Sequence, residues 1–391
     1  MIAHLGEQWT VILVILFFLF GLFLGARLRF GKKGPAERKD ARQSFHYVRG
    51  MYAMLTGEVE TAIEELSKVV ELSTEPIEVY LALGNLYRQR GQIDRAIRVH
   101  QSLLTRRSLS EEERVLALNA LGQDFKTGGL IDRALKTFRD ALALAPKDAD
   151  ALAHLVKLSE DLAEWGDAYE YAVRLQKVQR HREPRNLSYL LAQKAQRMAE
   201  DGQTFRAAWY LHKAIRQHPE NLPAYIFLAR LYLKAGKAEK ARRVVERALR
   251  RIPHKCFAVL GLLKEITMQL QDLEGYLKTL HDLAHEHHQK RAMLQEFQEF
   301  VDLKRTEQAQ ALVFDLVRHI GRSRLVQRTL WDLTRKGYLP REKEIELASL
   351  LAQSEQMTDS FTCIFCGYKT LDVLFRCPNC KEWNSFADGE N

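Results

Sequence analysis

Four cysteines near the carboxyl end of the chain are spaced for metal binding. Cys363 and Cys366 form one Cys-x-x-Cys pair, and Cys377 and Cys380 form a second pair after ten intervening residues. The two-residue gap lets both thiolates of a pair reach one ion, and two such pairs complete a tetrahedral four-sulfur shell. A closed shell leaves no position for water or substrate, so we expect a structural ion rather than a catalytic one.

The ion is expected to hold together a small metal-binding domain over residues 361–391. A segment this short buries too little apolar surface to fold unaided. Zinc is favoured over iron, although both accept tetrahedral thiolates. We expect a small β-ribbon that docks against the rest of the chain, because its large apolar side chains would otherwise be poorly covered. These side chains are Tyr368, Leu371, Val373, Leu374, Phe375 and Trp383.

Cysteine usage elsewhere indicates the compartment. The chain has five cysteines in 391 residues, and only Cys256 lies outside the two pairs. This scarcity is typical of a reducing compartment. We expect Cys256 to be an ordinary buried core residue.

The amino terminus predicts a membrane anchor over residues 1–30. From Thr10 to Ala26 the chain carries no charge, which is near the lower limit for a membrane-spanning helix. A cleaved signal peptide would begin with basic residues, whereas here Glu7 precedes the apolar run. A retained single-pass anchor is therefore favoured.

Basic residues after the apolar run predict the orientation. They fill a juxtamembrane linker expected over residues 31–42 and the segment just before it: Arg27, Arg29, Lys32, Lys33, Arg38, Lys39 and Arg42. Because basic flanks stay on the cytoplasmic side, the amino terminus is expected in the periplasm and the rest of the protein in the cytoplasm. The same cluster would suit anionic membrane lipids.

Residues 43–320 repeat with a period close to 34 residues. One series of mostly small residues comprises Ala62, Ala96, Ala134, Ala168, Ala207, Ala241, Gly275 and Ala309. A second series lies twelve residues upstream, at Gly50, Gly84, Gly122, Val156, Ala195, Ala229, Leu263 and Phe297. A 34-residue period of paired helices is that of the tetratricopeptide repeat, so about eight units are expected.

Stacked units of this kind form an all-α superhelical solenoid with an inner groove that binds proteins. From the register alone, the candidate groove residues are Asn85, Arg88, Gln89, Gln123, Lys126, Arg230 and Lys234. Solvated polar side chains are an equally good interpretation of these positions. Two closing helices are expected over residues 321–353, before a short polar linker.

Two other charged stretches are interpreted as solvated helix faces. His281 and His285 share a helical face in the sequence HDLAHEHHQ, but the stretch lacks the zincin pattern His-Glu-x-x-His. An arginine-rich run is expected to pair with Glu239 and Glu246. It comprises Arg242, Arg243, Arg247, Arg250 and Arg251. No phosphate loop, nucleophile elbow or dinucleotide fingerprint is present, so the sequence offers no candidate catalytic residues and no enzyme is expected.

In its order of parts the chain resembles the lipopolysaccharide assembly protein B family of Gram-negative bacteria. The parts are an anchor, tetratricopeptide-like units and two terminal rubredoxin-like Cys-x-x-Cys pairs. The segments 83–104, LGNLYRQRGQIDRAIRVHQSLL, and 375–383, FRCPNCKEW, carry the resemblance most strongly. It implies a non-enzymatic protein of the bacterial inner membrane that acts with other lipopolysaccharide assembly proteins. It further implies that the membrane protease FtsH and the deacetylase that commits lipid A synthesis are its partners.

Carried over by position, the resemblance makes Cys363, Cys366, Cys377 and Cys380 the metal ligands. Two departures from true rubredoxins favour structural zinc: the pairs are close together, and Lys381 stands where glycine is usual. The expected function is that of a membrane-tethered adaptor regulating lipopolysaccharide synthesis. The alternatives are an iron-binding redox protein and, ranked lower, a nucleic-acid-binding scaffold. No nucleic acid is expected as a partner.

Overall fold

The structure is a computed structural model that describes residues 35–72, 77–179, 184–320, 335, 345–346 and 360–388. The anchor expected over residues 1–30 lies outside these ranges. So do the expected closing helices, apart from residues 335, 345 and 346. Within the described ranges, no helix is both long enough and apolar enough to cross a membrane.

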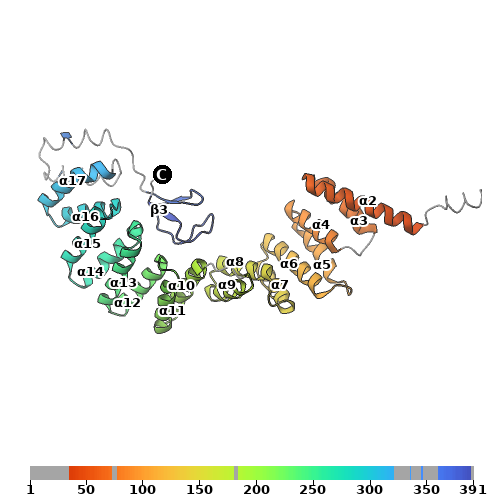
Figure 1. Cartoon of the computed structure of the whole chain (residues 1–391), viewed down its shortest axis with the longest axis horizontal. Coiled ribbons are helices and arrows are strands. Elements are labelled where there is room, and N and C mark those ends of the chain that lie inside the picture. The colour runs from red at the N-terminus through yellow and green to blue at the C-terminus, as the bar shows by residue number, and fades with distance from the viewer. Residues whose placement is uncertain are drawn as a thin grey trace, which may run out of the picture. The chain divides into compact units, whose positions relative to one another are not determined.

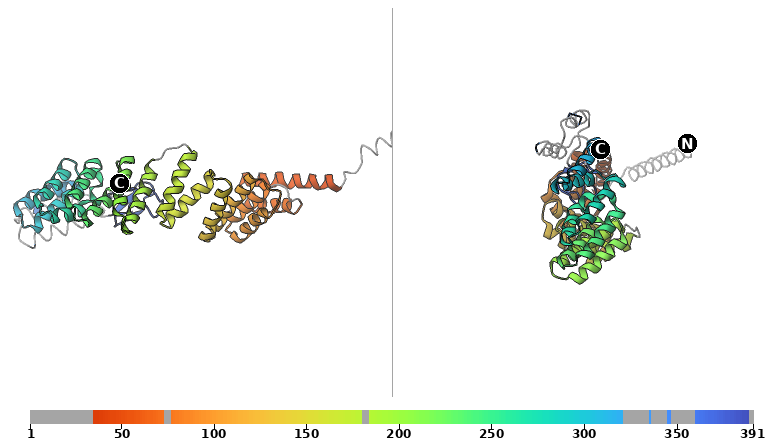
Figure 2. Two further views of the ribbon diagram at one scale, coloured as in Figure 1. Left: turned by 90° about the horizontal axis from the view of Figure 1, so that it is seen from below. Right: turned by 90° about the vertical axis from the view of Figure 1, so that its left-hand side faces the viewer.

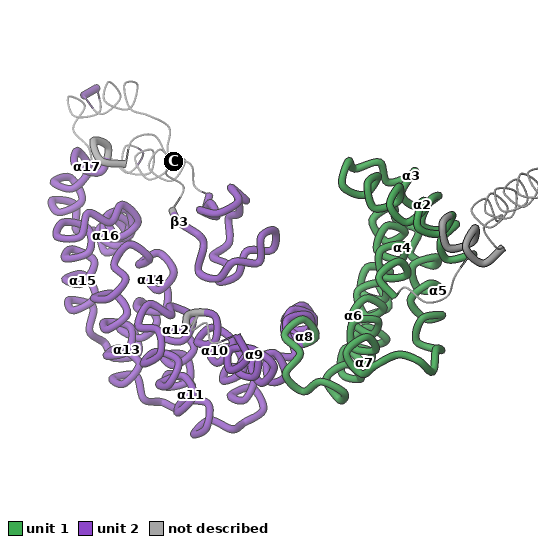
Figure 3. Tube along the Cα trace, turned by 45° about the vertical axis from the view of Figure 1, so that its right-hand side comes forward, with its two compact units in different colours: residues 1–151 green, residues 152–391 purple. Residues whose placement is uncertain are grey.

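The chain divides into two compact units, residues 1–151 and 152–391 (Figure 3). The described part of unit 1 contains three consecutive pairs of helices. They are α2 (Pro35–Thr56) with α3 (Val59–Leu72), α4 (Ile77–Gln89) with α5 (Ile93–Leu104), and α6 (Glu111–Thr127) with α7 (Ile131–Leu144). Each pair is one expected repeat.

Five more pairs follow, interrupted by the 3-10 helix η1 (Pro253–Ala258), and they lie in unit 2 apart from the first three residues of α8. The pairs are α8 (Ala149–Asp161) with α9 (Trp165–Gln179), α10 (Pro184–Glu200) with α11 (Thr204–Gln217), α12 (Leu222–Lys234) with α13 (Ala238–Arg251), α14 (Leu260–Gln269) with α15 (Leu273–His285), and α16 (Lys290–Asp302) with α17 (Thr306–Ile320). Figures 1 and 2 show these paired helices from three sides. The expected all-α repeat class is confirmed.

The beginning of the first repeat differs from the expectation. A linker was expected over residues 31–42, but α2 already begins at Pro35. Proline is well suited to the first helical position, because its missing N–H has no partner there. The residues that follow it, Ala36, Glu37, Arg38 and Lys39, are good helix formers.

Small residues allow the two helices of a pair to approach closely. The alanines of the first series, from Ala62 to Ala309, are at most 1% exposed. In the third pair, a Cβ on Gly122 would lie 2.7 Å from the ring of Phe138. In the second pair, a Cβ on Gly84 would collide with the ring of His100. The period found in the sequence is therefore the period of helix–helix contact.

The turn inside each pair requires a residue with positive φ. Five pairs place glycine there: Gly57, Gly91, Gly129, Gly202 and Gly236. The other three pairs use Ala163, Gln271 and Lys304, at φ values of 57°, 58° and 57°. Glycine adopts this conformation without steric cost, and other residues rarely do. The turn therefore persists in units whose sequence signature is weak.

The carboxyl-terminal domain is a three-stranded antiparallel sheet in the order β2-β1-β3. The strands are β1 (Phe361–Cys363), β2 (Lys369–Thr370) and β3 (Phe386–Asp388). Phe361 pairs with Thr370 on one side and with Asp388 on the other. The expected small β-ribbon is confirmed, and it belongs to unit 2.

Candidate metal centre and partner grooves

The two Cys-x-x-Cys turns of the ribbon have the same backbone geometry. The N–H of Gly367 donates to the carbonyl of Cys363 at 2.9 Å, and the N–H of Lys381 donates to the carbonyl of Cys377 at 3.0 Å. Gly367 has φ +72° and Lys381 has φ +64°. Lysine is therefore held where glycine would be unstrained. Both turns direct their sulfurs to one point between them.

The four sulfurs are arranged for one tetrahedral ion. Cys363 Sγ lies 3.6 Å from Cys380 Sγ, and Cys366 Sγ lies 3.6 Å from Cys377 Sγ. All four sulfurs lie within 4.8 Å of one another. Zinc with Zn–S bonds of about 2.3 Å would place its sulfurs about 3.8 Å apart. A disulfide needs about 2.05 Å, so the spacing fits metal ligation rather than disulfides.

The ionisation of the sulfurs also fits a cation. Burial opposes the charged form of Cys363, but the Ser385 hydroxyl and the backbone N–H groups of Phe365 and Cys366 outweigh it and lower the pKa of the Cys363 thiol to about 6. The backbone at Glu382 favours the Cys380 thiolate, but burial and the three other sulfurs raise the pKa of that thiol to about 12. Clustered thiolates repel one another, and a bound divalent cation would remove this penalty.

Trp383 fixes the ribbon to the repeats of unit 2. Its ring stacks on Tyr189 of α10 at 5.5 Å between centroids and 8° between planes. Trp165, at the start of α9, meets the Trp383 ring edge-on at 6.0 Å. Trp383 is 6% exposed. Tyr189 and Trp383, almost 200 positions apart, therefore share one small core. Figure 3 shows the ribbon beside the helices of unit 2.

A partly buried ion pair and two further ring contacts complete the docking. Arg376 Nη2 lies 2.5 Å from Glu160 Oε2 at the end of α8. Burial raises the pKa of Glu160, and the Arg376 guanidinium offsets part of that rise. The remaining contacts are Phe375 with Phe227 of α12 and Phe361 with Phe257 of η1. The ribbon thus contacts several consecutive repeats at once.

The expectation that the ribbon docks is confirmed, but not for every side chain named. Trp383 and Phe375 pack against the helices, whereas Val373 and Leu374 pack within the ribbon beside its sulfurs. Tyr368 and Leu371 remain 40% and 77% exposed. The apolar surface of the ribbon is therefore divided between a docking face and an open face.

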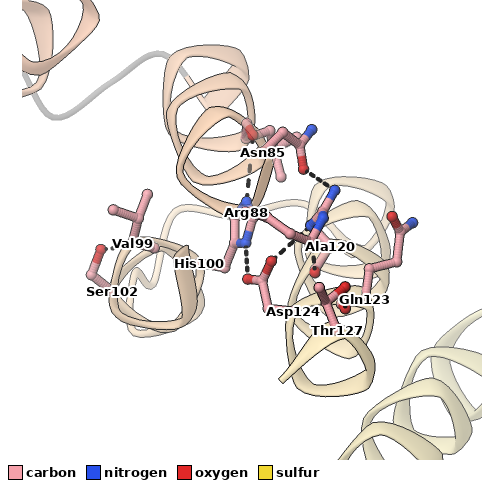
Figure 4. Close-up of polar contacts among 10 residues, drawn as sticks. Asn85, Arg88, Val99, His100, Ser102, Ala120, Gln123, Asp124 and Thr127 are labelled. Atoms are coloured by element: carbon pink, nitrogen blue, oxygen red, sulfur yellow. Dashed lines mark hydrogen bonds and ion pairs between the residues drawn. The ribbon is translucent and has the colours of Figure 1, made fainter. Parts of the chain in front are cut away.

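In unit 1, the structure joins two of the candidate groove residues in one polar network (Figure 4). Arg88 donates to Asp124 Oδ1 at 2.7 Å and to Asn85 Oδ1 at 2.6 Å. Asp124 Oδ2 lies 2.5 Å from Nδ1 of His100, and both side chains are fully buried. Arg88 is thus held in place rather than freely solvated. Gln89 is exposed, and Gln123 and Lys126 are partly buried on the following repeat.

Replacing Asp124 by asparagine is expected to destabilise unit 1 by about 3 kcal/mol or more, because it leaves Arg88 without its buried counter-charge. The measurement is urea unfolding of the full chain, with hydrogen exchange in α4 to α6 reporting on unit 1. Asp140→Asn is the matched control, because Asp140 is exposed on α7. Equal stability of the two variants would contradict a structural role for the network.

In unit 2, the structure places Arg230 and Lys234 at the rim of a cavity of about 230 Å³. Leu211, Phe227 and Leu231 supply its apolar lining. Phe227 also contacts Phe375 of the ribbon. Phe227 is therefore shared by the cavity and the docking contact. Both basic side chains are exposed beside the cavity.

Comparison with known proteins agrees with this architecture. Residues 361–388 match a rubredoxin metal binding domain, and residues 79–115 and 198–266 match tetratricopeptide repeat models.

The chain is 25% identical to lipopolysaccharide assembly protein B of Escherichia coli strain K12 over 371 residues, or 94% of each chain. It is 26% identical to the protein of that name from Haemophilus influenzae over 387 residues, covering 95% of this chain and 96% of that one. The resemblance to the lipopolysaccharide assembly protein B family is confirmed.

The similarity to lipopolysaccharide assembly protein B covers both the repeats and the ribbon. Among solved structures, a tetratricopeptide repeat protein from Parabacteroides merdae is 16% identical, with a TM-score of 0.37, and covers 62% of this chain and 92% of its own. The rubredoxin-type match and the four clustered sulfurs together indicate one structural metal ion in this protein.

The expectation for Cys256 is confirmed, and the expectation for the arginine-rich run is confirmed at Arg242. Cys256 is buried at 1% exposure, in the core of unit 2. In the arginine-rich run, Arg242 pairs with Glu239 at 3.8 Å and with Glu246 at 3.4 Å. Arg242 also reaches Asp272 at 2.7 Å, on the next helix pair. This contact joins two repeats.

The acidic partners of Arg88 and Arg376 were not predicted from the sequence. Asp124 and Glu160 each pair with an arginine from a different part of the chain. The available signal for Asp124 was its place between the apolar residues Leu121 and Phe125 on a buried helix face. A carboxylate at such a position requires a counter-charge. For Glu160 no local signal exists, because its partner lies in the ribbon.

Proposed function

We propose that this protein is a membrane-tethered, non-enzymatic adaptor in lipopolysaccharide assembly. Relatives that align over 94% of both chains carry the name lipopolysaccharide assembly protein B. The repeat scaffold supports a role in binding proteins. The observation that carries the proposal is the docking of the ribbon on the repeats, because it builds a composite surface from both. In finer detail, the adaptor presents the lipid A-committing deacetylase to the membrane protease FtsH.

The ribbon is proposed to present one partner surface and to be held by metal. Cys363, Cys366, Cys377 and Cys380 would hold one structural ion, with zinc favoured. Around the first Cys-x-x-Cys turn, Ile364, Phe365 and Leu371 are 63%, 56% and 77% exposed. Exposed apolar patches of this kind are typical of protein interaction sites. The ion's contribution is to keep this patch in shape.

The repeats are proposed to supply the other partner surface. In unit 2, Arg230 and Lys234 flank an apolar cavity, a combination that suits an acidic segment with an apolar anchor. In unit 1, Asn85, Arg88, Gln89, Gln123 and Lys126 are the corresponding candidates. A partner with complementary charge would be recognised at both grooves.

Tethering through residues 1–30 completes the proposal. We place the amino terminus in the periplasm and the repeats and ribbon in the cytoplasm, at the bacterial inner membrane. An anchor confines adaptor, client and protease to one surface, which raises their effective concentration without any new contact.

Affinity purification of the full chain from membranes tests this function. The expected result is recovery of FtsH and the deacetylase with the unaltered protein, and loss of at least one of them with Arg230→Glu/Lys234→Glu. The matched control is Lys240→Glu/Arg243→Glu, which makes the same charge change at exposed positions on the second helix of the same repeat. Recovery of neither protein would contradict the proposal. Equal losses with both double variants would contradict the groove assignment.

A further inference from the structure

Two histidines on α15 lie on the same face of the helix. His281 and His285 are four residues apart, and their ring centroids are 4.3 Å apart with planes inclined at 40°. Residues with this spacing lie on adjacent turns of a helix, so both rings can bind the same ligand. The expectation of a merely solvated helix face is therefore incomplete. The side chain of His281 is 60% exposed, but that of His285 is only 33% exposed.

A buried carboxylate from the next helix faces both rings. Glu296 lies on α16, and its side chain is 2% exposed. Its Oε1 lies 2.9 Å from Nδ1 of His281, and its Oε2 lies 3.5 Å from Nε2 of His285. Neither this Oε2 nor the facing Nε2 makes a hydrogen bond, although both atoms are buried. The hydrogen bond between His281 and Glu296 Oε1 accounts for the first contact only.

Unsatisfied atoms of this kind are costly, because burial removes the water that would pair with them. Here Glu296 Oε2 and His285 Nε2 face each other without a hydrogen bond. His281, beside them, does bond to the other oxygen of Glu296. An ion placed among the three groups would satisfy all of them together. This pair of unbonded atoms is independent of the histidine spacing and points to the same ligand.

The distances suit a transition-metal ion. One ligand atom from each of the three side chains lies within 4.8 Å of the other two. Tetrahedral zinc with bonds of about 2.05 Å to nitrogen or oxygen would place its ligand atoms about 3.3 Å apart. This value lies between the 2.9 Å from His281 Nδ1 to Glu296 Oε1 and the 3.5 Å from His285 Nε2 to Glu296 Oε2. Two imidazoles and one carboxylate are a donor set that zinc accepts, and it leaves a fourth position for water. The exposed side of His281 provides a route of entry.

We propose that His281, His285 and Glu296 form a second metal site, for a divalent transition-metal ion of the zinc type. This site is separate from the four sulfurs of the ribbon in ligand chemistry and in the elements that build it. Because α15 ends one helix pair and α16 begins the next, the bound ion cross-links two repeats. These two repeats carry Leu263 and Phe297 in the second series, where most other repeats have glycine or alanine. Metal binding here therefore tightens the end of the solenoid.

The test uses the full chain in detergent, equilibrated with buffered zinc and analysed for metal per chain. The expected result is one more zinc in the unaltered protein than in His281→Ala, whatever the occupancy of the ribbon. His287→Ala is the matched control, because His287 is exposed in the same stretch and lies outside the group. Helical content measured by circular dichroism is expected to be equal in all three proteins.

Competition with a chromophoric chelator measures the affinity of the site. His281→Ala and Glu296→Gln are each expected to weaken the zinc affinity of the site more than about 100-fold. Removing a residue that only hydrogen-bonds to a metal ligand costs about 10- to 100-fold, so a larger loss indicates direct ligation. The conclusion does not depend on Glu296→Gln folding normally, because His281 is exposed and its loss leaves the core intact. Absence of the additional zinc, its retention in His281→Ala, or an equal loss in His287→Ala would overturn the proposal.

Discussion

Replacing Cys377 by serine is expected to unfold the ribbon and to abolish control of lipopolysaccharide synthesis, while the protein stays in the membrane fraction. Cys377 is fully buried and lies 3.6 Å from Cys366 Sγ. Structural zinc contributes about 10–16 kcal/mol to folding in small zinc domains, which far exceeds what a three-stranded ribbon can gain from its own core. Without the ion, the contacts of Trp383 and Arg376 with the repeats are lost as well.

Three measurements check this prediction. Metal analysis is expected to show the loss of one ion per chain, and the visible spectrum of the unaltered protein distinguishes colourless zinc from coloured iron. Hydrogen exchange is expected to rise throughout residues 361–388. Cellular lipopolysaccharide is expected to depart from its normal level. Cys256→Ala is the matched control, because it removes a buried thiol outside the site. Normal lipopolysaccharide and full exchange protection in Cys377→Ser would contradict the prediction.

Replacing Trp383 by alanine is expected to release the ribbon from the repeats without emptying its metal site. The indole stacks on Tyr189, meets Trp165 edge-on and lies 5.5 Å from the guanidinium carbon of Arg376. Truncating a buried aromatic side chain costs about 3–5 kcal/mol, and here the loss falls on the docking contact. The four sulfurs are untouched, so metal content is expected to stay constant.

Hydrogen exchange separates this undocking from unfolding. In Trp383→Ala, exchange is expected to increase at the ends of α8 and α10 that contact the ribbon, with a smaller change around the cysteines. Leu371→Ala is the matched control, since Leu371 is a ribbon side chain that is 77% exposed. Partner recovery is expected to fall with Trp383→Ala if the adaptor uses the composite surface. Unchanged protection of α8 and α10 would show that Trp383 does not fix the ribbon.

The repeat architecture was predictable because its determinants are local. Each helix pair packs mainly through residues within about one period of each other, such as Gly122 against Phe138. A strict spacing of small residues therefore appears directly in the sequence. The cysteine pairs were predictable for the same reason, because each Cys-x-x-Cys turn is closed within five residues by hydrogen bonds such as Gly367 N–H to the carbonyl of Cys363.

Polar partners were harder to predict, because their pairing joins different helices. The repeat register makes Arg88 a candidate groove residue, but its bond to Asp124 could not be inferred from that register. The sequence alone predicts a solvated face for the histidines on α15, because Glu296 belongs to another helix pair and no nearby residue indicates its burial. Charge and burial at such positions are decided by which helices pack together.

The four cysteines show most clearly what the sequence determines and what only the tertiary structure decides. Their types and spacing determined that one ion is held in a closed shell, because tetrahedral thiolate geometry follows from two short turns. Only the tertiary structure decided where that shell lies, with Trp383 against Tyr189 and Arg376 against Glu160. Contacts across some 200 residues depend on the shape that the stacked repeats present. The sequence thus determined the helix pairs, the ribbon and its metal ligands, and packing determined the composite surface that the ribbon and the repeats form together.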